Sequence, residues 1–574
     1  MKRGQIIQGT VIRTDFPNKG IVEYEEVNGL GEHVRYQIQV KGVLPGQTVS
    51  VRIKKARREK PQGMLLEVIA PAPQETAEAA CPYFGSCGGC NYQTLPYEEQ
   101  LELKKNQVLD LIRPVCDGIS EFVYDGILPS PSQWQYRNKM EFSFGDEVKD
   151  GPLTLGLHKK GSFHDILPVS GCAIVHPDFS RILDCVCAFG REKGLDYYHK
   201  NTHTGVLRHL LVRRSISTGE LLVGLVTSSQ QELTEQVVEL ADRLKALSLE
   251  GEICGFLHIL NDSMGDVVQS DETRLIFGRD WFMEEILGLK FRISAFSFFQ
   301  TNTKGAEVLY EQARKYILAH DADFEGKTVF DLYSGTGTIA QIIAPVAGHV
   351  IGVEIVEEAV EAARENAAMN GLTNCEFMAG DVLKVIDEIR ERPDYIILDP
   401  PRDGIHPKAL DKIIDYGVEH LVYISCKPTS LARDLVVLQE RGYRVERMCN
   451  VDMFPNTVHV ETVVLLSHKK PDGHINVKVE FGEGEGKVPL DNIAKRAEEY
   501  KPKERVTYKM IKEYIEAKYG FKVHTAYIAE VKRDLGLPMY DAPNAVEELK
   551  QPRKHPTAEK VEAIKDALRY FEVI

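Results

Sequence analysis

The stretch Lys327-Thr-Val-Phe-Asp-Leu-Tyr333-Ser-Gly335-Thr-Gly337 predicts a buried strand that ends in a glycine-rich turn. A helix over 338–344 is expected after the turn, and the alternation of strand and helix continues beyond it. The further strands and the second helix are predicted at 349–354, 356–370 (the helix), 374–378, 394–399 and 420–425. Strands that alternate with helices are typical of an α/β fold with a doubly wound, Rossmann-like parallel sheet.

The chain before this sheet has a different pattern. Residues 5–70 contain short alternating strands separated by glycine and proline, which predict a small β-barrel of the oligonucleotide-binding kind. Up to residue 70, twelve basic and seven acidic side chains give a net charge of about +5, although the whole chain carries −15. Because salt screens charges over about 8 Å, a basic module on an acidic body can bind RNA.

The 574 residues divide into four predicted domains. These are the barrel at 1–70, an α+β central domain at 71–290, the α/β domain at 291–470 and a helical extension at 471–574. A helix near 97–113 is expected to pack on the α/β domain. The apolar runs 443–447 and 459–466 are close together in the chain, so they predict an antiparallel hairpin at the sheet edge.

Several classes of protein are excluded by composition. The longest apolar stretch, 338–353, is interrupted by Gln341, Pro345 and His349, so a membrane span is not expected. The N-terminus has no apolar segment typical of a secretory signal, which predicts a cytoplasmic protein. The eleven cysteines are therefore expected to be reduced, and any cluster of them is a candidate metal site.

The glycine-rich turn predicts a nucleotide-like ligand. Glu354 follows Gly335 by nineteen residues, near the position of a carboxylate that binds a ribose. The turn lacks the third glycine of the dinucleotide fingerprint, so S-adenosylmethionine is a better candidate than NAD. The alternative is an ordinary strand-to-helix turn without a ligand.

Two more motifs follow predicted strands of the same sheet. Asp399-Pro-Pro-Arg402 holds a carboxylate at the edge where open α/β sheets bind ligands, although it could also be a simple helix N-terminus. Ser425-Cys426-Lys427-Pro428 places a thiol at that edge, and the adjacent Lys427 is expected to favour the thiolate. The alternative for Cys426 is a buried apolar residue.

A thiolate beside a methyl donor indicates one particular reaction. C5 of uracil is too weak a nucleophile to attack a sulfonium methyl group. Addition of a thiolate at C6 converts C5 into an enolate-like carbon that is strong enough.

A third group of residues is Cys81-x5-Cys87-x2-Cys90. Three thiols this close in a reduced protein predict a metal site, which needs one further ligand. Zinc and an iron–sulfur cluster both fit the spacing.

Six motifs in one order resemble the RNA uracil-C5 methyltransferases. They are Cys81-x5-Cys87-x2-Cys90, Phe298-Phe-Gln300-x-Asn302, Asp331-Leu-Tyr-x-Gly-x-Gly, Asp399-Pro-Pro-Arg402, Ser425-Cys426-x-Pro and His459-Val-Glu461-Thr. The resemblance covers about residues 5–470. The N-terminal module is similar to the TRAM domain of this family, which implies the branch that methylates 23S ribosomal RNA rather than the tRNA branch.

The resemblance implies roles for individual residues. Cys426 would be the nucleophile and Glu461 the base that removes the C5 proton. A [4Fe–4S] cluster would be held by Cys81, Cys87, Cys90 and the more distant Cys172. The expected S-adenosylmethionine contacts are Gln300, Tyr333, Glu354, Asp381 and Asp399.

Contacts with structured RNA are also expected. The resemblance implies that Arg137-Asn-Lys139 contacts RNA, and the alternative for it is a solvated turn. Phe296, Phe298 and Phe299 could stack on displaced bases or belong to the core. Two functions remain as alternatives to methylation of 23S rRNA: the same reaction on tRNA, and a non-catalytic iron–sulfur RNA-binding protein.

Overall fold

The computed structural model describes residues 1–27, 31, 33–56, 61–265, 267–319, 324–385, 388–389, 391–468, 508–535 and 556–571. The chain forms two compact units, Met1–Gly473 and His474–Ile574. Among the described residues, no helix is long and apolar enough to cross a bilayer.

The first five strands close into a barrel in the order β1-β2-β3-β5-β4, as predicted. Their bounds are β1 Ile6–Asp15, β2 Lys19–Val27, β3 His33–Lys41, β4 Thr48–Lys55 and β5 Gln62–Ala70. Alternate residues face inward, and valine and isoleucine side chains such as Val22, Ile38 and Val49 fill the interior completely. The basic run at 54–60 continues into positions 57–60, which lie outside the described residues.

The central part of the chain contains a seven-stranded sheet in the order β13-β12-β11-β10-β7-β8-β9. Its strands are β7 Lys139–Asp146, β8 Leu153–His158, β9 Ile166–Leu167, β10 Leu207–Arg214, β11 Glu220–Thr227, β12 Glu252–Leu260 and β13 Glu272–Gly278. The helices α2 (Pro177–Glu192) and α3 (Thr234–Lys245) share one apolar core with this sheet. A separate hairpin, β14 (Trp281–Ile286) and β15 (Leu289–Ser294), leads into helix α4 (Thr303–Leu318).

The predicted α/β sheet has eight strands in the order β18-β17-β16-β19-β20-β22-β21-β6. Its strands are β16 Thr328–Leu332, β17 His349–Glu354, β18 Cys375–Ala379, β19 Tyr395–Leu398, β20 His420–Ser425, β21 Tyr443–Val451, β22 Glu461–His468 and β6 Val123–Leu128. Its remaining helices are α5 Thr338–Ile343, α6 Glu357–Met369, α7 Val382–Val385, α8 Pro407–Asp415 and α9 Pro428–Glu440. The strands from β18 to β20 are parallel, which confirms the Rossmann-like prediction.

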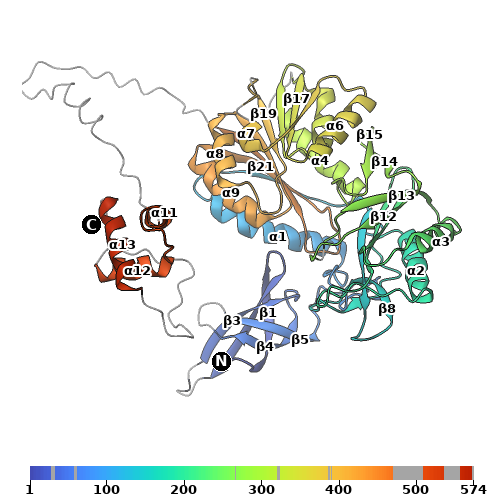
Figure 1. The fold of residues 1–574 in the computed structure, drawn as a ribbon, viewed down its shortest axis with the longest axis horizontal. Coiled ribbons are helices and arrows are strands. Elements are labelled where there is room, and N and C mark those ends of the chain that lie inside the picture. The colour runs from blue at the N-terminus through green and yellow to red at the C-terminus, as the bar shows by residue number, and fades with distance from the viewer. Residues whose placement is uncertain are drawn as a thin grey trace, which may run out of the picture. The chain divides into compact units, whose positions relative to one another are not determined.

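Helices cover both faces of this sheet. Neighbouring residues of a strand alternate between two apolar cores, with Val329 in the core that includes α4 and α6 and Phe330 in the core that includes α8 and α9. The helix α1 (Tyr97–Cys116) belongs to the second core and lies beside α9, as Figure 1 shows in light blue and orange. The sheet therefore leaves only its strand ends for a ligand.

The predicted hairpin forms as β21 and β22, but it does not make the sheet edge. Strand β6, from a segment some 320 residues earlier, pairs in parallel with β21 and becomes the edge strand. Asp125 of β6 forms an ion pair with Arg447 of β21 (2.6 Å) and accepts a hydrogen bond from Tyr316 (2.6 Å). These polar contacts fix the register of two strands that are distant in the chain.

The described part of the second unit contains three helices, α11 (Tyr508–Tyr519), α12 (Thr525–Asp534) and α13 (Ala558–Tyr570). Buried side chains such as Ile515, Ile528 and Leu568 give it a core of its own. The rest of the helical extension predicted at 471–574, namely 471–507, 536–555 and 572–574, lies outside the described residues.

Candidate active site

The glycine-rich turn after β16 brings bare backbone to the edge of the sheet. Tyr333, Gly335 and Gly337 all have positive φ angles (69°, 54° and 70°). A Cβ atom at Gly337 would lie 2.4 Å from the ring of Phe377, so only glycine fits there. The turn thus leaves open backbone beside the strand ends.

Glu354 at the end of β17 supports this turn. One carboxylate oxygen accepts a hydrogen bond from the Gly335 amide (3.0 Å), and the other accepts from the amides of Ile355 and Val356 (2.9 and 3.0 Å). Since a carboxylate has about four acceptor positions, one remains for a hydroxyl group such as that of a ribose. The contact of Glu354 with a ligand stays a prediction.

The predicted nucleophile and base lie at one edge of the sheet. Cys426 follows Ser425, which pairs with Thr462 next to Glu461 at the start of β22. Asp399 follows β19, the other neighbour of β20. The sheet therefore brings together three side chains from segments up to 62 residues apart.

All three groups are protonated more readily than usual. Burial, with Asp399 nearby, raises the pKa of the Glu461 carboxyl to about 8. Burial raises the pKa of Asp399 to about 7. For Cys426, burial and the carboxylates of Glu461 and Asp399 raise the thiol pKa to about 11. A buried base with a pKa near neutrality suits proton transfer.

The sequence predicts that the cation beside Cys426, Lys427, favours the thiolate. The Lys427 ammonium lies 3.8 Å from an Asp403 carboxylate oxygen. Arg402 of the Asp-Pro-Pro-Arg motif lowers the pKa of both Cys426 and Glu461, against the larger effect of burial.

The other predicted ligand contacts lie around the same edge. Asp381 raises the pKa of the Tyr333 hydroxyl after the larger effect of burial, so these two side chains are neighbours. The Asp381 carboxylate also accepts a hydrogen bond from the Leu383 amide (3.0 Å). The backbone of Gln300 accepts a hydrogen bond from the buried amide of Asn138 (2.9 Å), which ties the Arg137-Asn-Lys139 turn to the site.

Two residues at the site were not predicted. Tyr310 of α4 hydrogen-bonds the Gln300 side chain, and its pKa is raised by burial and by the nearby Asp399, Asp331 and Glu461. Asp331 of the turn motif is fully buried, with its pKa raised to about 8 by burial and Asp399. One Asp331 oxygen accepts from the Ala340 amide (2.9 Å), and the other has no hydrogen-bond partner within the described residues.

The three phenylalanines before Gln300 differ in environment. Phe298 is 67% exposed and Phe296 is 43% exposed, whereas Phe299 is buried against Phe291 with ring centroids 6.1 Å apart. Phe298 lies beside the glycine-rich turn, 3.9 Å from the position of a Cβ atom at Gly335. Phe296 and Phe298 are therefore free to stack on a base, and Phe299 belongs to the core.

The four predicted cluster cysteines line one small cavity. Cys81, Cys87, Cys90 and Cys172 share it with Tyr83, Gln93 and several apolar side chains. A hydrogen bond from the Tyr83 hydroxyl to the Ser170 carbonyl (2.9 Å) joins the two segments. Burial raises the pKa of Cys90 to about 12 and of Cys172 to about 11, and other cysteines of the set add to both shifts.

These thiols are not arranged around a single ion. In the part of the chain that the structure describes, no three cysteine, histidine or carboxylate side chains come close enough to hold one metal ion. A tetrahedral zinc site needs sulfur atoms about 2.3 Å from the metal and so about 3.8 Å from one another. The metal site predicted for these cysteines therefore stays a prediction.

Comparison with known proteins shows the family of the chain. Residues 217–469 match the family model described as tRNA (Uracil-5-)-methyltransferase. Uncharacterized RNA methyltransferases of Clostridium tetani and Clostridium acetobutylicum are 46% and 47% identical to the chain. Each alignment covers 82% of this chain and 99% of the relative.

A solved structure has the same fold. The tRNA (uracil-54, C5)-methyltransferase of Pyrococcus abyssi, in complex with S-adenosyl-L-homocysteine, aligns with a TM-score of 0.60. It is 24% identical, and the alignment covers 80% of this chain and all of that one. The relatives at 46% and 47% identity show that the chain is an RNA methyltransferase. More particularly, the chain belongs to the S-adenosylmethionine-dependent uracil-5 RNA methyltransferases.

Proposed function

We propose that the enzyme methylates C5 of a uridine in structured RNA through a covalent bond between Cys426 and C6 of the base. The observation that carries the proposal is the meeting of Cys426, Asp399 and Glu461 at one edge of the sheet, close enough to shift the pKa of the thiol. A thiol and a base of raised pKa are the two groups that this reaction needs.

The proposed steps begin once the target uridine has left its stack. The Cys426 thiol gives up its proton to solvent, the resulting thiolate adds to C6, and the electron pair of the C5=C6 bond moves toward C5. C5 then takes the methyl group from the sulfonium donor, which leaves as S-adenosylhomocysteine. Glu461 removes the C5 proton, and the electron pair of that C–H bond restores the double bond and expels the thiolate.

The donor is proposed to lie over the glycine-rich turn, where Gln300, Tyr333, Glu354, Asp381 and Asp399 surround it. The free acceptor position of Glu354 suits a ribose hydroxyl, and the exposed side chains of Ile355 and Val356 offer apolar contact to a purine.

The proposed substrate is 23S rRNA, acted on in the cytoplasm. The support is the N-terminal barrel, whose strand β4 carries three exposed basic side chains, Arg52, Lys54 and Lys55. Such residues neutralise phosphates without reading sequence. The rival is tRNA, the substrate in the names of the family model and of the Pyrococcus abyssi enzyme.

We also propose that Cys81, Cys87, Cys90 and Cys172 hold a [4Fe–4S] cluster. Their convergence on one cavity from two segments supports this set. Cys185, the next cysteine along the chain, lies on α2 and does not line that cavity.

A direct experiment is methylation of unmodified 23S rRNA and tRNA transcripts with labelled S-adenosylmethionine, followed by mapping of 5-methyluridine. Labelled 5-methyluridine in 23S rRNA and none in tRNA is the expected result. Label in tRNA alone would overturn the choice of substrate, and label in neither would overturn the proposed activity.

A further inference from the structure

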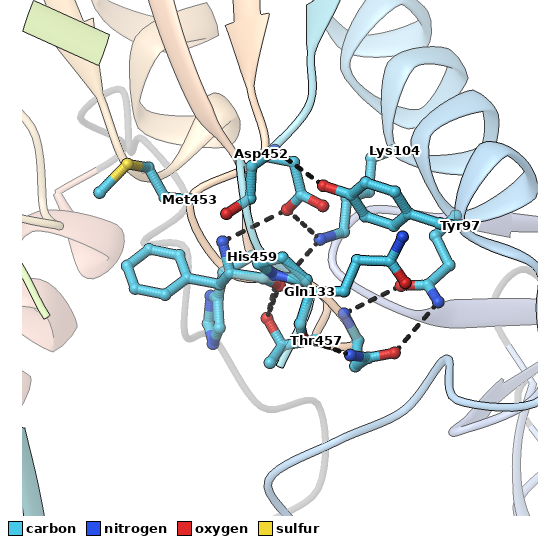
Figure 2. Close-up of polar contacts among 12 residues, drawn as sticks. Tyr97, Lys104, Gln133, Asp452, Met453, Thr457 and His459 are labelled. Atoms are coloured by element: carbon cyan, nitrogen blue, oxygen red, sulfur yellow. Dashed lines mark hydrogen bonds and ion pairs between the residues drawn. The ribbon is translucent and has the colours of Figure 1, made fainter. Parts of the chain in front are cut away.

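The loop of residues 452–460 carries Glu461 at its end. It joins β21 to β22, and the two residues that flank it, Val451 and Glu461, face each other across the hairpin. The geometry of this loop therefore sets where the carboxyl of Glu461 points. Figure 2 shows polar contacts of residues in this loop, among them Asp452 and Thr457.

A buried ion pair holds the start of this loop. The Lys104 ammonium of α1 lies 2.6 Å from an Asp452 carboxylate oxygen, and both side chains are 0% exposed. Lys104 also donates to the Phe454 carbonyl (3.0 Å), so one cation binds two points of the loop. The Tyr97 hydroxyl lies beside Asp452 and accepts a hydrogen bond from the Ser130 amide (2.8 Å).

Other segments hold the backbone of the next residues. The Asn302 side chain donates to the Met453 carbonyl (2.9 Å), and the Tyr136 hydroxyl donates to the Pro455 carbonyl (3.0 Å). Asn302 also begins helix α4, where its side-chain oxygen accepts from the Gly305 amide (2.9 Å). The loop is thus bound to elements on both sides of the active site.

Asn456 adds a third kind of contact. Its carbonyl accepts from the amides of Asn91 and Tyr92 (2.8 and 3.1 Å), which directly follow Cys90. Its amide donates to the side chain of Gln100 on α1 (2.9 Å), and its φ of 66° is one that few residues other than glycine adopt. A backbone this constrained has one conformation.

Buried ion pairs contribute little net stability, because desolvation of both charges offsets their attraction. Replacement of such a pair by apolar side chains of similar volume is often neutral or stabilising. The pair is therefore better explained by the single arrangement that it imposes on the loop than by the free energy of folding.

We propose that Lys104 and Asp452 are positioning residues that fix the loop of 452–460 so that Glu461 faces the proton on C5. The inference rests on the proposed function, because it assigns proton removal to Glu461. Cys426 is held separately, at the end of β20. Loosening the loop thus slows only the last step, and the methylated RNA stays bound to Cys426 for longer.

The test is the double variant Lys104→Met, Asp452→Leu in the full chain, which removes both charges and keeps the volume. With unmodified 23S rRNA transcript we expect an unchanged rate of methyl transfer in a single turnover. We expect release of methylated RNA to slow at least tenfold, and a protein–RNA adduct that survives denaturation to accumulate. Asp452→Asn, which keeps the shape of the side chain, is judged by the same measurements should the double variant not fold.

Transcripts that contain 5-fluorouridine separate positioning from general damage. With fluorine at C5 there is no proton to remove, so thiolate addition and methyl transfer give a trapped adduct without Glu461. The double variant is expected to form this adduct at the wild-type rate. The control is Asp178→Asn, which alters a buried carboxylate of the central region that accepts from the Glu250 and Gly251 amides (3.0 Å each). It is expected to lower the melting temperature without slowing release.

Two results would overturn the inference: release at the wild-type rate by a folded double variant, or loss of 5-fluorouridine trapping by it. Failure of the wild-type enzyme to form any adduct would overturn the proposed function, and the inference with it.

Discussion

The active site and the cysteine cavity both bury ionisable groups, but they are built differently. Cys426 and Glu461 are attached to neighbouring strands whose backbone hydrogen bonds fix their separation. The four cysteines of the cavity come from turns and short connections outside the helices and strands. A site on a sheet keeps its geometry without a ligand, whereas a site on turns depends more on the group that it holds. Substitutions in the active site should therefore change the reaction, whereas substitutions in the cysteine cavity should change the bound group and the stability.

The largest effect is expected from Cys426→Ala. Without the thiol, C5 is not activated, so methyl transfer should fall by at least about 10⁴-fold. The sheet supplies the surrounding geometry, and we expect unchanged affinity for S-adenosylhomocysteine by calorimetry and an unchanged melting temperature. Glu461→Gln is the matched variant, which should transfer the methyl group and then stall as a denaturation-resistant adduct. An adduct formed by Cys426→Ala would show that another residue is the nucleophile.

The cysteine cavity should respond in the opposite way. Cys172→Ser is expected to lose iron and inorganic sulfide together with the visible absorbance, and to lower the melting temperature by several degrees. The matched variant Cys185→Ser should retain both. The measurement is metal and sulfide analysis of protein purified without oxygen. Stoichiometric zinc without sulfide in the wild-type protein would exclude the cluster.

A smaller effect is expected in the pH dependence of stability, to which the active site contributes through Glu461. The pKa of Glu461 is raised from an ordinary value of 4.5 to about 8, so the folded protein binds this proton more tightly than the unfolded chain. Its contribution to stability is complete below about pH 4.5 and is lost as the pH rises through about 8. Glu461→Gln cannot ionise and should be more stable than wild type by about 5 kcal/mol at pH 9, and by less than about 1 kcal/mol near pH 5.

Thermal unfolding of both proteins between pH 5 and 9 measures this difference. Glu358→Gln, at an exposed position of α6, is the control and should follow the wild type. A stability gain of Glu461→Gln that is larger at pH 5 than at pH 9 would contradict the raised pKa.

The smallest effect is expected in the barrel. Replacement of the exposed Arg52, Lys54 and Lys55 by glutamine should reduce the slope of log K against log salt for RNA binding by about 2. Affinity for S-adenosylhomocysteine should stay the same, since the barrel is not part of that site. The measurement is RNA binding between about 50 and about 300 mM salt. If the variant has the same slope as the wild type, these side chains do not contact phosphates.

Much of the candidate site could be predicted because its residues directly follow apolar strands. The turn at Gly335, the acid Asp399 and the thiol Cys426 each end a run of buried residues, and in a parallel sheet such ends meet at one edge. The hairpin that brings Glu461 was predictable from two adjacent apolar runs. The role of Glu461 as a base was expected from the family resemblance and not from this pattern.

Other features have no local signal. Tyr310 lies on an amphipathic helix, where a tyrosine is usually a core residue. Lys104 and Asp452 are 348 residues apart, so no spacing rule connects them. The segment Val123-Tyr-Asp-Gly-Ile-Leu128 is half-buried and contains a glycine, and its partner strand begins more than 300 residues later. Contacts between residues this far apart in the sequence arise from tertiary packing alone.

The edge strand β6 has a consequence for synthesis of the chain on the ribosome. Its partner β21 is completed only at Val451, so β6 and α1 must wait while more than 300 residues emerge. During that interval the apolar side of α1 has no partner, and a nascent chain of this kind depends on rapid folding of the intervening central region or on chaperones. A fragment that begins at residue 291 would keep β21 as an open edge and would tend to self-associate. The fold should therefore tolerate a truncation or fusion point after β22 better than one between β5 and β16.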